Sequence, residues 1–231
     1  MQKALVVLLC LAAPPVLADM PESDGIAVQG LLSDADFYRL VTCGAPPGGA
    51  CRAASLRWTK PSLTLAIAPA ANAEPPGFRA RLVAAAQNAI DEVNAIGAGI
   101  RIDLIPAGPA DITIRPTALT EGAILSETPG FSGAGVMGVG YMTVWSNAEN
   151  RITEAVILIS TSISDADLTS VMLEEVTQSL GFLFDIEGPA YEGVSILSQT
   201  SNATTRLTGQ DAMLLRRHYP PNRPDPAQDQ P

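Results

Sequence analysis

Leu173-Glu174-Glu175-Val176-Thr177-Gln178-Ser179-Leu180-Gly181 is the stretch of the chain that decides the fold. Apolar residues recur through and around it every three or four positions, which predicts an amphipathic helix: Leu168, Val171, Met172, Val176, Leu180 and Leu183. Ser164 and Asp165 are placed to cap the start of this helix, and Gly181 is placed to end it. Because residues four apart share one side of a helix, the side chains of Glu174 and Gln178 are neighbours, whereas Glu175 points nearer the apolar stripe.

The segments before and after this helix alternate between strand and helix periodicity. Large apolar residues alternate in 63–67, 100–104 and 111–115, which predicts strands, and Pro116 is expected to end the third. Residues 141–145 and 152–159 predict two more strands, the second the most buried. Helical spacing predicts a helix of about five turns over 78–96, a helix turn at 34–41 and a closing helix at 207–219. The fold class is therefore α+β.

The first 18 residues have the pattern of a secretory signal peptide. Lys3 precedes an apolar run, residues 4–13, that is too short to span a bilayer, and Val16-Leu17-Ala18 is typical of a cleavage site. We therefore expect an exported protein, periplasmic or extracellular, after cleavage near Ala18. Removing Lys3, the only charged residue of the segment, changes the formal charge from −10 to −11. An acidic chain of this kind is not expected to bind nucleic acid, and no later segment is long and apolar enough to cross a membrane.

Cleavage would leave two cysteines, Cys43 and Cys51, with seven residues between them in a loop rich in glycine and proline. Two cysteines this close in an exported protein predict a local disulfide. The loop is small, so we expect it to contribute roughly 2–3 kcal/mol to stability at most.

The order of elements and two motifs resemble the metzincin branch of the zinc peptidases, particularly the matrixin-like ones, over about residues 57–219. The helix stretch matches H-E-x-x-H-x-x-G at its second position and at its glycine. Ser195-Ile196-Leu197, followed after a loop by the helix that starts near Leu207, resembles the family's methionine-turn and closing helix.

The Arg57-Trp58 strand, the paired cysteines and the Glu-Glu-x-x-Gln helix together resemble an uncharacterised exported bacterial family, domain of unknown function 2927. The resemblance implies a metzincin-like (zincin) domain with a mixed twisted sheet, a long helix after the first strand, a motif-bearing helix and a C-terminal helix. The expected organisation is a signal peptide (1–18), an N-terminal extension with the cysteine loop (19–56), the zincin-like domain (57–219) and a disordered, proline-rich tail (220–231).

The chain departs from the zinc-peptidase pattern at each position that contacts metal. Glu174 and Gln178 replace two histidine ligands, the third ligand position falls at Phe184, and Leu197 stands for the methionine. Since His218 is the only histidine, no ordinary zinc site can be built, and we expect neither zinc nor another cofactor. Glu174, Gln178 and Asp185 are the candidates for a hard-cation site, but a hydrogen-bonded polar patch is the interpretation we favour.

These departures favour a non-catalytic pseudoenzyme over an enzyme. We expect an envelope-associated or binding role, with an unidentified peptide or protein ligand in the former substrate cleft. The alternative is a hydrolase or peptidase that uses a non-zinc metal or carboxylates alone. Glu175, which keeps the position of the catalytic glutamate, would then be its base; otherwise it is a structural carboxylate.

Two further features carry less weight. Gly133-Ala134-Gly135-Val136-Met137-Gly138 matches G-x-G-x-x-G, but a dinucleotide site needs a strand before it and a helix after it. We expect a loop beside the cleft instead. His218 lies at the end of the closing helix, where a partial positive charge on its side chain would interact favourably with the helix dipole.

Overall fold

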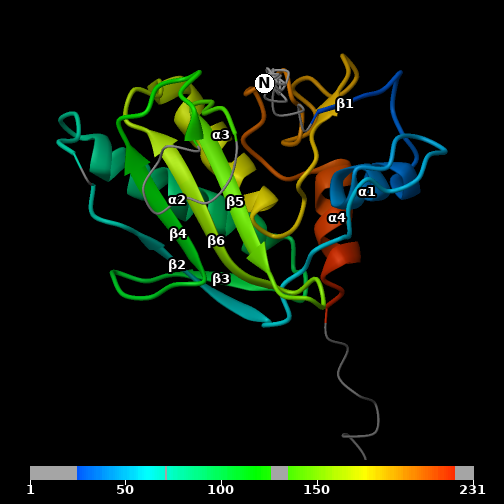
Figure 1. Cartoon of the computed structure of the whole chain (residues 1–231), viewed down its shortest axis with the longest axis horizontal. Helices are drawn as coiled ribbons and strands as arrows, with labels where there is room; N and C mark the ends of the chain where they lie inside the picture. Colours follow the sequence, from blue (N-terminus) through cyan, green and yellow to red (C-terminus); the bar gives the residue numbers. More distant parts are fainter. Residues whose placement is uncertain (1–24, 71, 126–134, 222–231) are drawn as a thin grey trace, which may run out of the picture.

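The computed structural model describes residues 25–70, 72–125 and 135–221, so the predicted signal peptide and most of the tail lie outside the described residues. Its centre is a five-stranded sheet in the order β3-β2-β4-β6-β5 (Figure 1). Four strands run parallel and β5 runs antiparallel to β6, so the mixed sheet expected from the sequence is confirmed. The bounds are β2 Ser62–Ile67, β3 Arg101–Leu104, β4 Ile112–Thr117, β5 Gly140–Ser146 and β6 Ile152–Ser160.

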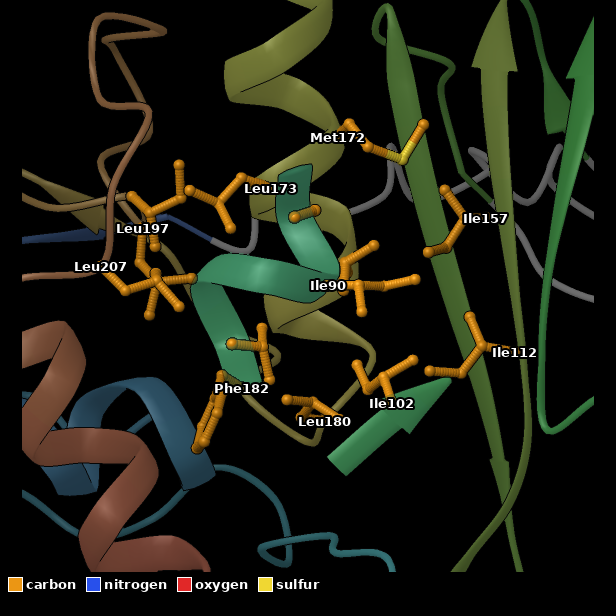
Figure 2. Close-up of a cluster of buried hydrophobic side chains, with 14 of the residues drawn as sticks. Ile90, Ile102, Ile112, Ile157, Met172, Leu173, Leu180, Phe182, Leu197 and Leu207 are labelled. Carbon is orange, nitrogen blue, oxygen red and sulfur yellow. The ribbon is translucent and has the colours of Figure 1, made fainter. Parts of the chain in front are cut away.

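Two helices, α2 (Phe78–Ala95) and α3 (Asp165–Gln178), cover one face of this sheet (Figure 1). Apolar side chains from both helices and from the sheet meet in the main core, where Ile90, Ile157 and Met172 lie close together (Figure 2). A second, small cluster on the other face packs Leu125 and Met137 against Val156 and Leu158 of β6. The strand β6 is therefore buried on both faces, as its continuous apolar sequence predicts.

Pro116 does not end its strand, contrary to the expectation from the sequence. The strand β4 continues to Thr117, and Pro116 lies opposite Ile159 of β6. The carbonyl of Ile114 accepts from Ala68 N, so alternate residues of β4 face β2, and Pro116 is one of them. Because β2 ends at Ile67, no strand residue in the described part of the chain pairs with Pro116 on this side, and the ring is tolerated.

A smaller unit packs beside the sheet, built from α1 (Asp34–Cys43), α4 (Gly209–His218) and the two-residue strands β1 (Ile26–Ala27) and β7 (Ile186–Glu187). Helix α1 is longer than the helix turn expected over 34–41, because Gly44 at φ 69° closes it with backbone bonds to Arg39 and Leu40. The parallel pairing of β1 with β7 was not predicted, since two-residue strands have no periodicity to detect.

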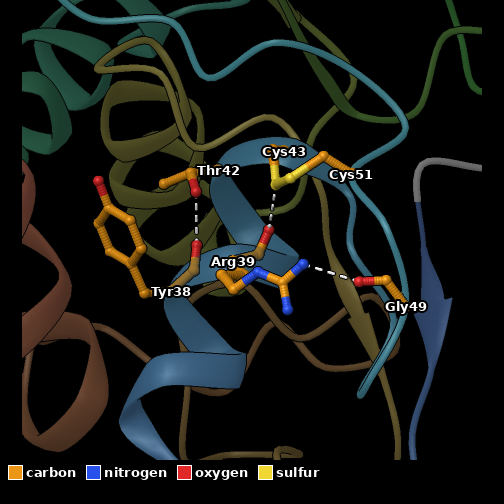
Figure 3. Close-up of a disulfide and its surroundings, with 6 residues drawn as sticks. All are labelled: Tyr38, Arg39, Thr42, Cys43, Gly49 and Cys51. Atoms are coloured by element: carbon orange, nitrogen blue, oxygen red, sulfur yellow. Dashed lines mark hydrogen bonds between the residues drawn. A yellow bond between two sulfur atoms is a disulfide. The ribbon is translucent and has the colours of Figure 1, made fainter.

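The structure forms the predicted disulfide between Cys43 and Cys51 (Figure 3). The Arg39 guanidinium donates to the Gly49 carbonyl at 2.7 Å and so ties the cysteine loop to α1. Among the described residues, no helix is long and apolar enough to span a membrane.

Two aromatic residues fix the end of α3 relative to the C-terminal helix. The Trp58 indole N–H donates to the Ser179 carbonyl at 2.9 Å, and the Tyr219 hydroxyl donates to the Leu180 carbonyl. The Trp58 backbone N–H in turn donates to the Tyr219 hydroxyl. All these groups are buried, so the turn that follows the motif helix is held from two directions.

Candidate functional site

A cleft with a volume of about 810 Å³ lies between the edge strand β5 and helix α3. Both long walls come from regular elements: residues Gly140 to Val144 of β5 form one, and the other is the face of α3 that carries Asp167, Val171, Glu174, Glu175 and Gln178. Residues from the loops beyond α3 close one end, namely Leu183, Asp185, Gln199 and Asn202. The structure therefore brings together all four acidic and amide residues that the sequence singled out.

Helix α3 begins where the sequence predicts. Ser164 is its N-cap, and the Ser164 hydroxyl accepts from the Asp167 N–H at 3.1 Å while donating to the Asp167 carboxylate at 2.6 Å. The helix ends at Gln178, three residues before the expected Gly181, and a tight turn carries the chain on to that glycine. This start and direction place Glu174 and Gln178 one turn apart on the cleft.

Gln178 and Asp185 are joined directly. The Gln178 amide nitrogen donates to Asp185 Oδ1 at 2.8 Å, and both side chains are more than nine-tenths buried. The two residues lie seven positions apart and meet because the chain reverses at the turn after α3. The amide therefore presents its donor group to the carboxylate.

Glu175 lies in the cleft wall against β5, and 7 % of it is exposed. Its carboxylate occupies the space above Gly140, where an added Cβ would come within 3.0 Å of Glu175 Cδ and closer still to Oε1. The same Cβ would also clash with Val171. The absence of a side chain at residue 140 is thus what allows the helix and the edge strand to approach each other here.

Gly181 requires a glycine for two reasons. Its φ of 104° lies in a region that L side chains rarely adopt. A Cβ at this position would also overlap the Leu56 carbonyl oxygen, within van der Waals distance of the His218 ring as well. The motif's glycine therefore lets the segment before Trp58 pack directly under the turn.

Phe184, at the position of the third metal ligand in the resemblance, does not line the cleft. Its ring packs against Gly44, where a Cβ would lie 2.7 Å from the ring, and its N–H donates to the Val41 carbonyl. The side chain is directed at the C-terminal end of α1. At this position the chain has an apolar contact with the N-terminal extension.

The turn at Ser195–Leu197 is held by a residue that the sequence analysis missed. Asp211 of α4 accepts from the Ser195 hydroxyl at 2.7 Å and from the Ile196 N–H at 2.9 Å. Burial raises the pKa of Asp211 to about 6, against the effect of these two hydrogen bonds. An acidic residue in the first turn of a predicted helix was the available signal. Leu197, the last residue of this turn, replaces the methionine of the resemblance and is fully buried.

The expectation that His218 carries a favourable positive charge is wrong. The side chain is buried, and that burial lowers its pKa to about 4. Its Nε2–H donates to the Leu56 carbonyl at 2.9 Å, and Nδ1 accepts from the Tyr38 hydroxyl at 3.0 Å. His218 is therefore a neutral side chain whose two hydrogen bonds connect α4 to α1 and to the segment before Trp58.

The glycine-rich loop is described only from Gly135 onward, because residues 126–134 lie outside the described part of the chain. The element that follows it is the strand β5. A dinucleotide site needs a helix there, so the match to that fingerprint has no structural support.

The residues at the expected metal positions do not fit a zinc ion. Zinc in such a site is bound by three imidazoles, whereas here the amide of Gln178 donates to Asp185 and Phe184 faces away from the cleft. In the part of the chain that the structure describes, no three His, Cys, Asp or Glu side chains gather closely enough to hold a metal.

Comparison with known proteins gives one family and a distant structural likeness. Two solved structures of myroilysin, each 16 % identical, align with TM-scores of 0.43 and 0.42 over 72 % of this chain and 83 % and 86 % of theirs. No curated protein matches the chain. A family model described as "Protein of unknown function (DUF2927)" matches residues 58–223, which is well over half of the chain. The chain thus belongs to the DUF2927 family.

Proposed function

We propose that this protein is a non-catalytic binding protein with a metzincin-like fold, and that its cleft holds an extended polypeptide segment as an added strand beside β5. The observation that carries the proposal is the place of β5 in the cleft, as the last strand of the sheet among the described residues. The order of strands ends at β5, and five consecutive residues of this strand line the cleft. Adding a strand to such an edge is a common mode of peptide recognition.

The backbone groups available for this pairing follow from the register. The Ser160 N–H donates to the Val139 carbonyl at 2.9 Å, and Tyr141 lies opposite Leu158. Hydrogen-bonded and non-hydrogen-bonded pairs alternate along antiparallel strands. Residues 139, 141 and 143 therefore face β6, and the N–H and C=O groups of Gly140, Met142 and Val144 point out from the sheet.

The volume of the cleft and its lack of fit to zinc agree with a binding role. A volume of about 810 Å³ lies within the range of ordinary ligand sites, roughly 300–1,000 Å³. The lack of fit to zinc removes the group that would activate water in the peptidases that the motif resembles. Export would follow from the predicted signal peptide, and the disulfide of the structure is compatible with an oxidising compartment.

The test is binding of fluorescein-labelled octapeptide pools, measured by fluorescence anisotropy, with a variant that blocks the edge. Met142→Pro removes one outward N–H and places a ring on the outer edge of β5, while the ladder to β6 stays intact. We expect it to weaken binding at least tenfold. Leu104→Pro is the matched control, because Leu104 faces out from the opposite sheet edge: Ile105 N donates to Leu65 on the β2 side.

Equal losses in both proline variants, or no binding by the wild type, would contradict strand addition beside β5. Mass spectrometry of the recovered peptides tests the catalytic alternative in the same samples. We expect intact peptides. Cleavage by the wild type that is abolished in Glu175→Gln, with binding retained, would show a hydrolase with Glu175 as its base and would overturn the non-catalytic proposal.

A further inference from the structure

We infer that the cleft selects extended segments that place a large apolar side chain opposite Tyr141, on the face of the sheet that α3 does not cover; this inference rests on the proposed binding of a segment beside β5. The receiving surface is apolar and is formed by Tyr141, Val136 and Ile124. Val136 and Tyr141 both line the cleft, so this surface is continuous with the place beside β5 where the segment would bind.

A short outer ribbon, residues 123–125 and 135–137, lies on the sheet face opposite α3. Its two halves are joined by backbone hydrogen bonds of 2.9 and 2.8 Å, one on each side of Ile124 and Val136. These two residues form an antiparallel bridge. They are therefore a non-hydrogen-bonded pair, the kind of pair in which opposite side chains lie closest together.

Successive side chains of the outer ribbon point in opposite directions, which divides them into a buried and an exposed pair. Leu125 and Met137 are buried in the small cluster on β6. Ile124 and Val136 are directed the other way, and 55 % of Ile124 and 40 % of Val136 is exposed. Packing on the sheet accounts for the first pair but does not explain a second apolar pair on the outside of the ribbon.

Tyr141 connects the outer ribbon to the edge of β5. A Cβ added to Gly135 would overlap the Tyr141 hydroxyl and ring, so this half-buried side chain reaches the ribbon next to Val136. Tyr141 packs on the small cluster, whereas its neighbour Met142 packs on the main core. The ring of Tyr141 therefore lies on the ribbon side of the sheet, at the strand that lines the cleft.

The pairing of an added strand fixes which ligand side chain meets this surface. Residues directly opposite each other on neighbouring strands point to the same face of a sheet. The ligand residue opposite Tyr141 therefore lies on the ribbon side, and the ligand residues before and after it point toward α3. A leucine at that position would contact the Tyr141 ring and reach Val136, and its burial would remove apolar surface of both partners from water.

The test uses fluorescein-labelled octapeptides of threonine in which one central residue is leucine, asparagine or serine. The uniform background lets the peptide shift along β5 until the central residue lies opposite Tyr141. By fluorescence anisotropy we expect the leucine peptide to bind roughly tenfold more tightly than the asparagine and serine peptides. Salt should change this preference little, because an apolar contact carries no charge to be screened.

Variants of the exposed pair locate the contact. Ile124→Ser and Val136→Ser should each reduce the preference for leucine, and the double variant should abolish it, because the exposed pair then offers no apolar surface. Val194→Ser is the matched control: 55 % of Val194 is exposed, as for Ile124, but Val194 lies outside the cleft lining. Its preference should equal that of the wild type. Thermal unfolding of each variant verifies that the fold is retained.

Three outcomes would overturn the inference. Equal affinity for the leucine and asparagine peptides, with both weakened in Met142→Pro, would remove the apolar selection and leave strand binding in place. A preference for leucine that survives in the folded double variant would show that the leucine binds elsewhere, such as on the α3 side. Absence of binding by every peptide would overturn both this inference and the proposed function.

Discussion

At the scale of single residues, the positions that bind metal in the resembling peptidases have other contacts in this chain. Gln178 donates to Asp185, Phe184 packs on Gly44, and Leu197 is buried in the turn that Asp211 holds. Each replacement has a partner that suits its chemistry: a carboxylate for an amide, an apolar surface for an aromatic ring. These contacts make the present side chains part of the packing, so restoring histidines at 174 and 178 alone would not rebuild the third ligand.

Gly140 is the residue on which the width of the cleft depends most directly. We expect Gly140→Ala to lower the free energy of unfolding by about 1–3 kcal/mol, because the new methyl group overlaps Val171 and the Glu175 carboxylate. The long Glu175 side chain can move, whereas the short Val171 side chain, which is buried, cannot. Urea denaturation would give both the change in midpoint and its slope.

A double-mutant cycle separates this overlap from a general loss of packing. Val171→Ala alone should destabilise the protein by about 1 kcal/mol through a small cavity. Combined with Gly140→Ala, it should restore room for the methyl group, so the double variant should be more stable than the sum of the single changes by at least 0.5 kcal/mol. Additive losses would show that the helix and β5 do not meet at Gly140.

At the scale of elements, the sequence predicts what periodicity can reveal. The helices α2 and α3 and the five strands of the sheet were located within a few residues, because a buried face imposes a repeat of 3.6 or 2 on the sequence. The strands β1 and β7 are too short to show a repeat, and Pro116 was misassigned because its tolerance depends on where the neighbouring β2 ends. Both features depend on tertiary pairing that a local pattern does not contain.

The candidate site also combines residues that helical periodicity locates with residues whose positions depend on tertiary structure. The sequence placed Glu174, Glu175 and Gln178 on one helix, and their neighbourhood follows from helical spacing. Asp185 was grouped with Gln178 through the family resemblance and not through periodicity, since their contact depends on how the chain turns after Gly181. No pattern in the sequence showed that Phe184 faces α1. The position of β5 as the last strand among the described residues depends on the order of strands in the sheet, which no local signal encodes.

The N-cap of α3 can be compared directly with the N-cap of α1. Ser164 caps α3 and Ser33 caps α1 with the same pattern, in which each hydroxyl accepts from the N–H of an aspartate three residues on and donates to its carboxylate. Ser164→Ala should cost about 1 kcal/mol of stability, and Ser33→Ala should cost a similar amount. Only the first should also weaken peptide binding, because Asp167 lines the cleft and Asp36 does not. Thermal unfolding and anisotropy measure the two effects separately, and equal effects on binding would refute the assignment of Asp167 to the site.

At the scale of the whole molecule, the N-terminal segment is part of the same core as the sheet and its helices. Phe37, Leu40 and Val41 of α1 are buried in the main core cluster, and the Ile26 N–H donates to the Asp185 carbonyl next to the cleft. Contacts at Phe184 and His218 extend this packing to the turn after α3 and to α4. Residues that precede the first strand of the sheet therefore pack against the segment after α3 that forms one end of the cleft.

Two buried groups on α4 should give the folding stability opposite dependences on pH. Burial raises the pKa of Asp211 from 3.8 to about 6, so its contribution is fully present below about 3.8 and is lost as the pH rises through 6. Burial lowers the pKa of His218 from 6.5 to about 4, so its contribution is present above about 6.5 and is lost as the pH falls toward 4. Each effect corresponds to roughly 3 kcal/mol at full extent.

Urea unfolding of the wild type, Asp211→Asn and His218→Gln between pH 7 and pH 4 measures the two effects. As the pH falls, the wild type should gain stability relative to Asp211→Asn and lose stability relative to His218→Gln, because each variant lacks one of the titrating groups. Glu149→Gln should follow the wild type throughout, since Glu149 is exposed in a turn. Differences that stay constant with pH would mean that neither group titrates as its burial requires. If both stability differences, wild type minus Asp211→Asn and wild type minus His218→Gln, fell together as the pH falls, the two hydrogen bonds to Asp211 would outweigh its burial and keep it ionised.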